Sequence, residues 1–126
     1  GKRAVWLAVG VATTMILMRA SSTGSPALAV AANAMGALTG RLYTPTMMTA
    51  VYNQAKGSPC VLRFHIATEG GWDVGCTAGC LIAAGLITLG VPLSGVILLT
   101  LLGLAASFTL MRRYYAMNPS AAPAIV

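Results

Sequence analysis

The only two acidic residues of this chain, Glu69 and Asp73, lie four positions apart in a long apolar stretch. This spacing places both carboxylates on one face of a helix, with His65 one turn earlier on the same face. Two carboxylates on one stripe can bind a cation or carry a proton, whereas His65, close to the start of the stretch, is expected to be a polar anchor. Because ionisable groups inside an apolar helix ordinarily face other protein or a water-filled cavity, Glu69 and Asp73 are candidates for a polar pathway.

A second set of polar residues, Asn33 and Arg41, lies in the preceding apolar segment. Arg41 is ~16 Å along its helix from Tyr52, and Asp73 is ~14 Å from Phe64, so the two charges are expected at matching depths on antiparallel helices. Two interpretations follow. In the first, a pathway for a small solute or a coupled ion is lined by Arg41, Asp73, Glu69 and Asn33. In the second, an Arg41–Asp73 ion pair only holds two helices together.

The composition predicts that these residues lie in a membrane. The chain has 126 residues, of which 57% are hydrophobic and 8% charged, against roughly 45–50% and 25% in soluble domains. We therefore expect an all-α membrane protein with a four-helix transmembrane region over residues 1–117. The predicted spans are about 4–22, 27–54, 62–89 and 93–111, with a kink at Pro45, a tight hairpin turn at residues 90–92 and a disordered tail over 118–126.

Several function classes are disfavoured. The net charge of +6 comes from scattered basic residues, without the stripe that nucleic-acid binders use. One histidine, two acids and no phosphate-binding loop predict neither an enzyme nor a cofactor. The odd set of Cys60, Cys76 and Cys80 predicts no disulfide framework and no metal site, and Cys76 and Cys80 are expected to be small buried packing residues.

The basic residues also predict topology. If four spans alternate, one side carries six basic residues, namely Lys2, Arg3, Lys56, Arg63, Arg112 and Arg113. The other side carries only Arg19. Because loops rich in Lys and Arg stay in the cytoplasm, both chain ends are expected there.

Glycines recur every four residues in two of the predicted spans. Such spacing lets helix backbones approach closely, so these glycines are expected at helix contacts. They are Gly36 and Gly40 in the second span and Gly71, Gly75 and Gly79 in the third.

A family resemblance rests on three stretches, YNQAKGSP at 52–59, LRFH at 62–65 and EGGWDVG at 69–75. Together they resemble the cytoplasmic turn and following helix of bacterial major facilitator superfamily transporters, although the family's Gly-x-x-x-Asp loop signature is not present in its usual form. The resemblance implies the last four helices of a twelve-helix inner-membrane transporter that moves a small solute by alternating access. A chain that begins Gly-Lys-Arg is then expected to be an incomplete piece, with the remaining helices and the lipid bilayer as partners.

Two other hypotheses stay open. A complete four-helix exporter, similar to the small multidrug-resistance proteins, would act as a dimer, but its key acid is expected in the first helix, which here has none. A membrane scaffold that transports nothing would use Arg41 and Asp73 only to hold helices together.

Overall fold

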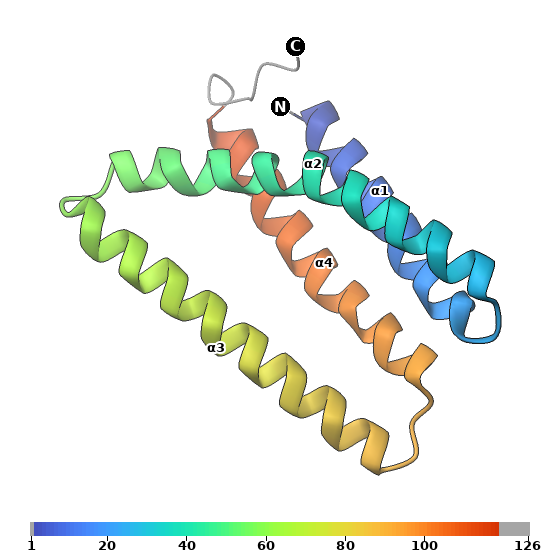
Figure 1. Ribbon diagram of the computed structural model, residues 1–126. Coiled ribbons are helices and arrows are strands. Elements are labelled where there is room, and N and C mark those ends of the chain that lie inside the picture. The colour runs from blue at the N-terminus through green and yellow to red at the C-terminus, as the bar shows by residue number, and fades with distance from the viewer. Residues whose placement is uncertain (1, 119–126) are drawn as a thin grey trace.

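The computed structural model describes residues 2–118, and four α-helices account for most of this part of the chain (Figure 1). They are α1 (Lys2–Ser21), α2 (Pro26–Lys56), α3 (Val61–Thr88) and α4 (Leu93–Met117), and a short 3-10 turn, η1 (Ser22–Gly24), follows α1. No strand is present between residues 2 and 118. The predicted all-α class with four helices is confirmed, while the predicted tail, apart from Asn118, lies outside the described residues.

Three of the helical segments are long and apolar enough to cross a membrane: Arg3–Gly24, Val61–Thr88 and Leu93–Met117. The second predicted span is present as α2, a helix of 31 residues, but it is not among these segments. Polar residues such as Asn33, Arg41 and Gln54 lower its hydropathy. That α2 also crosses the membrane stays a prediction.

Turn residues set the boundaries of the helices. Ser25 caps α2, because its side chain accepts a 3.5 Å hydrogen bond from the amide of Leu28, and Pro26 occupies the first turn, where no amide is needed. Between α3 and α4, Gly90 adopts a φ of 86°, a left-handed conformation that glycine tolerates best. The chain therefore reverses at the predicted turn, but α3 and α4 then diverge rather than packing along their length (Figure 1).

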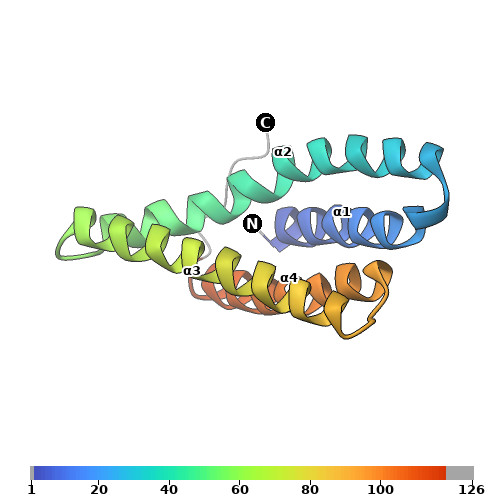
Figure 2. The same cartoon turned by 60° about the horizontal axis from the view of Figure 1, so that its bottom comes forward.

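Helix α1 lies between α2 and α4 (Figure 2). Its buried face includes Ala4, Ala8 and Ala12, spaced every four residues, together with Val5 and Ile16. Because alanine side chains are short, this stripe lets the neighbouring helices approach α1 closely.

The hydrophobic core lies where the start of α1 meets the second half of α2 and the end of α4. It consists of Val5, Ala50, Met111 and Tyr115. Since Val5 and Tyr115 are close to opposite ends of the described chain, this cluster holds both of those ends on the same side of the molecule.

Helix α2 changes direction near Pro45. It follows α1 over its first half and turns away over its second half (Figures 1 and 2). Proline lacks an amide hydrogen and its ring crowds the preceding turn, which explains the bend predicted from the sequence. The second half of α2 thereby leads away from α1, and α3 starts at its far end.

Helix α3 has no buried residue, although it is 28 residues long. Its neighbours within the described chain are limited to the ends of α2 and α4 (Figure 1). Its side chains are therefore free to face lipid, a solute pathway or other helices.

Candidate functional site

The second half of α2 and the first half of α3 line an open cavity of about 300 Å³ next to their connecting turn. Its α3 wall follows positions 65, 68, 69, 72 and 73, which form one stripe of a helix. The lining residues are Met48, Val51 and Tyr52 from α2 and His65, Thr68, Glu69, Trp72 and Asp73 from α3. The stripe on α3 thus places both acids of the chain, its one histidine and one of its two tryptophans in a single cavity, and α2 forms the opposite wall.

The two carboxylates of this cavity have no basic partner in the described part of the chain. No ion pair and no side-chain hydrogen bond to Glu69 or Asp73 is present within residues 2–118, although the hydroxyl of Thr68 donates to the carbonyl oxygen of Phe64 at 2.9 Å. Both acids are exposed. Their negative charge is therefore available to a cation or a proton that enters the cavity.

Aromatic rings form the rest of the polar wall. The ring centroids of Tyr52 on α2 and His65 on α3 lie 5.6 Å apart. Trp72 follows Glu69 by three residues on the same stripe of α3. Faces of Trp and Tyr attract cations, and carboxylates beside them strengthen that attraction. The chemistry of the cavity thus suits a protonated or cationic solute, or a proton held by a carboxyl group.

Arg41 does not join this site. It is exposed on the first half of α2, it lines none of the described cavities, and it makes no ion pair among residues 2–118. The expected pairing with Asp73 assumed that the helices run side by side at that depth. Because α2 bends at Pro45 and diverges from α3, matching depths do not bring the two charges together (Figure 1).

Asn33 lies at the other end of the bundle, where it bridges α1 and α2. Its side-chain oxygen accepts a 3.2 Å hydrogen bond from a guanidinium nitrogen of Arg19. Both residues line a separate cavity of about 260 Å³ beside η1 and the start of α4. The four predicted pathway residues thus divide into Glu69 and Asp73 in one cavity, Asn33 in another and Arg41 in neither.

The predicted glycine contacts are only partly formed within this chain. A side chain added at Gly36 would meet the guanidinium of Arg19 at 3.4 Å, so α1 approaches α2 there. Nothing lies within 4 Å of such a position at Gly40, Gly71, Gly75 or Gly79. Close contact at these four glycines stays a prediction about helices beyond the described ones.

The sequence interpretation of the cysteines needs correction. Cys76 and Cys80 are exposed, because α3 has no neighbour along its middle, so the expectation that they are buried is wrong. Trp72 lines the cavity together with the acids. Thr68 was not predicted to be a site residue. It precedes Trp72 by four residues and Glu69 by one, and this spacing places it on the same face of the helix.

The fold and the apolar helices define an all-helical membrane protein. No protein-family model, no curated protein and no solved structure matches the chain. No cluster of three or more metal-binding side chains occurs within the part of the chain that the structure describes. The resemblance to the major facilitator superfamily therefore rests on the residues quoted for it.

Proposed function

We propose that this chain forms part of a secondary active transporter of the major facilitator type, which moves a small solute across a membrane by alternating access. One observation carries the proposal: the only two acids of the chain meet in one cavity and have no basic partner within residues 2–118. A charged group at the centre of a spanning helix costs roughly 2.5–3.5 kcal/mol during insertion. Carboxylates without a basic partner on a predicted span are best explained by a function that requires them, such as binding a cation or a proton.

In this proposal, Glu69 and Asp73 hold the coupled ion or the charged part of the solute. A proton that binds one carboxylate removes its charge and weakens its attraction for a cation, so protonation and solute binding compete. Tyr52 and Trp72 supply the aromatic wall. The role of the protein is to expose this cavity to the two sides of the membrane in turn.

The exposure of α3 supports a larger assembly. None of its residues is buried, and Gly71, Gly75 and Gly79 are open to close approach by another helix. In a twelve-helix transporter, the remaining helices would cover part of this surface and complete the pathway. The same interpretation assigns the end of the bundle with Arg3 and Arg112 to the cytoplasmic side of a bacterial inner membrane.

Alternating access can be tested without knowledge of the substrate. In the product of the full reading frame, Cys60 is replaced by Ser and Cys76 and Cys80 by Ala, and Thr68→Cys then places one thiol in the cavity. Right-side-out and inside-out vesicles are treated with a membrane-impermeant maleimide. A transporter is expected to react at position 68 from both sides, because the cavity opens to each side in turn.

Val74→Cys, which is exposed on the opposite face of α3 and outside the cavity, is the matched control in the same background. Labelling at position 68 from one side only, or from neither, would reject alternating access and favour the scaffold hypothesis. The reading frame supplies an independent check, since a twelve-helix transporter requires about eight further spans upstream.

A further inference from the structure

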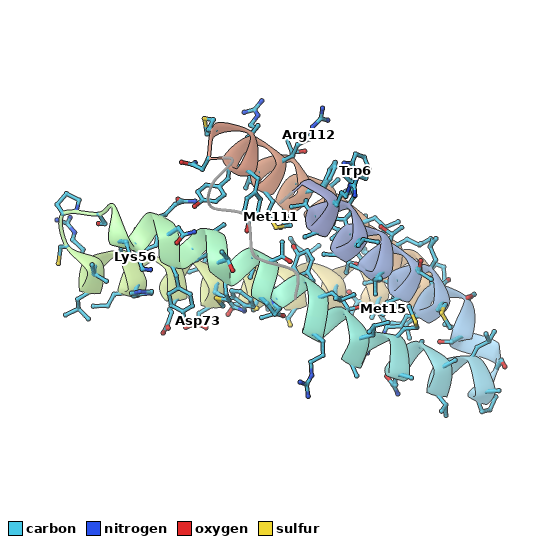
Figure 3. All side chains as sticks on the ribbon, turned by 90° about the horizontal axis from the view of Figure 1, so that it is seen from above. Trp6, Met15, Lys56, Asp73, Met111 and Arg112 are labelled. Atoms are coloured by element: carbon cyan, nitrogen blue, oxygen red, sulfur yellow. The ribbon has the colours of Figure 1, made fainter. Side chains whose placement is uncertain are left out.

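A third cavity, of about 260 Å³ and distinct from the one beside η1, lies between the start of α1 and the end of α4. It is lined by Val5, Trp6, Phe108, Arg112, Tyr115 and Ala116. Figure 3 shows Arg112 and Trp6 next to each other, with Asp73 beyond α2 on the other side of the molecule. This cavity is separate from the α2–α3 site and shares no residue with it.

The rim of this cavity is positively charged. Arg112 also lines an adjoining cavity of about 220 Å³ together with Arg113. Arg3 is exposed on α1 and precedes Trp6 by three residues, so it lies one turn away on the same face. No ion pair neutralises these arginines among residues 2–118, because both acids of the chain line the α2–α3 cavity.

The wall below the arginines is apolar. The rings of Trp6 and Phe108 meet edge to face with 4.7 Å between their centroids, and Val5 adds an aliphatic surface. Trp6 is 61% exposed, and its indole N–H donates to no group in the described chain. The hydroxyl of Tyr115 already donates to Thr46, so Tyr115 contributes its ring.

We propose that this cavity binds an anionic phospholipid. Arg112 pairs with the lipid phosphate, because a guanidinium offers two parallel donors to phosphate oxygens, and Arg3 and Arg113 add positive charge. The acyl chains lie against Trp6 and Phe108, where an amphipathic indole ring sits at the level of the headgroups. A membrane lipid fits better than free phosphate, because the basic rim continues directly into the apolar faces of two candidate membrane helices.

The proposal can be tested by native mass spectrometry of the full-length protein, purified in detergent and titrated with phosphatidylglycerol or phosphatidylcholine. The wild type is expected to prefer phosphatidylglycerol by on the order of tenfold or more. Arg112→Gln is expected to lower that preference roughly fivefold, the effect of one basic residue near an anionic lipid. Arg63→Gln removes the same charge from the exposed start of α3 and should leave the preference unchanged.

Equal losses in Arg112→Gln and Arg63→Gln would overturn the proposal, because they would show a general charge effect instead of a site. Displacement of phosphatidylglycerol by millimolar inorganic phosphate would assign the cavity to free phosphate and reject the lipid. If Arg112→Gln does not fold, Arg3→Gln replaces it, since Arg3 is exposed and lies one turn from Trp6. An unchanged preference in the folded variant would also overturn the proposal.

Discussion

The hydroxyl of Tyr115, near the end of α4, donates a 2.8 Å hydrogen bond to the main-chain carbonyl oxygen of Thr46 in the middle of α2. The bond joins residues 69 positions apart, and Tyr115 is only 2% exposed. Thr46 directly follows Pro45, where α2 bends. The contact therefore ties α4 to the bend that points the second half of α2 toward the candidate site.

Loss of this hydrogen bond is expected to destabilise the bundle. Tyr115→Phe keeps the buried ring but removes the donor, so the free energy of unfolding should fall by roughly 0.5–1.5 kcal/mol. Reversible unfolding in mixed micelles measures the change. Tyr114→Phe is the control, because the Tyr114 hydroxyl makes no hydrogen bond within residues 2–118. Equal losses in the two variants would show that the Tyr115 bond adds nothing.

The alanine stripe of α1 leads to a second prediction. Ala8 is 1% exposed at the contact of α1 with its neighbours, so Ala8→Leu has no room for its added atoms. Overpacking of this kind is expected to lower the free energy of unfolding by about 1–3 kcal/mol. Ala78→Leu, on the exposed part of α3, tests the same change without a neighbour within this chain. A neutral Ala8→Leu variant would contradict the close packing of α1.

The turn between α2 and α3 carries a natural probe of topology. Cys60 is exposed at the start of α3, near Lys56 and Arg63. If this basic turn lies in the cytoplasm, a membrane-impermeant maleimide should label Cys60 in inside-out vesicles and not in intact cells. A variant in which Cys76 and Cys80 are replaced by Ala confines the signal to Cys60. Labelling of Cys60 in intact cells would show that this turn lies outside the cytoplasm and would contradict the proposed orientation.

Local patterns predicted those parts of the fold that depend on neighbouring residues. The bend at Pro45 and the turn at residues 90–92, where Gly90 is left-handed, follow from residue chemistry at single positions. The common face of Glu69 and Asp73 follows from helical periodicity.

Contacts between distant segments were not predictable in the same way. The Tyr115–Thr46 bond depends on how far α2 bends, which no local pattern encodes. The Ala4, Ala8 and Ala12 stripe has the same spacing as the glycines but was overlooked, although it makes the contact that the glycines of α3 do not make within this chain. Small-residue spacing indicates that a helix can be approached closely, but it does not identify the neighbour.

The separation of Arg41 from Asp73 leads to the last prediction, which a double-mutant cycle tests. Residues without contact or a shared partner have additive effects within about 0.3–0.5 kcal/mol. Arg41→Gln, Asp73→Asn and the double variant should therefore show unfolding free energies that add, because no ion pair links the two positions within residues 2–118. The charge swap Arg41→Asp with Asp73→Arg should likewise fail to restore what either single change removes.

A second double-mutant cycle, at Arg19 and Asn33, is the positive control for this result. Arg19 and Asn33 are joined by a hydrogen bond of 3.2 Å, so Arg19→Gln and Asn33→Ala should couple measurably in the same assay. Strong coupling between Arg41 and Asp73 would show that the helices close on each other in the membrane and that the pair is structural. Additivity there, alongside coupling at Arg19 and Asn33, would leave Asp73 without an arginine partner and available to the solute or ion that the α2–α3 cavity is proposed to bind.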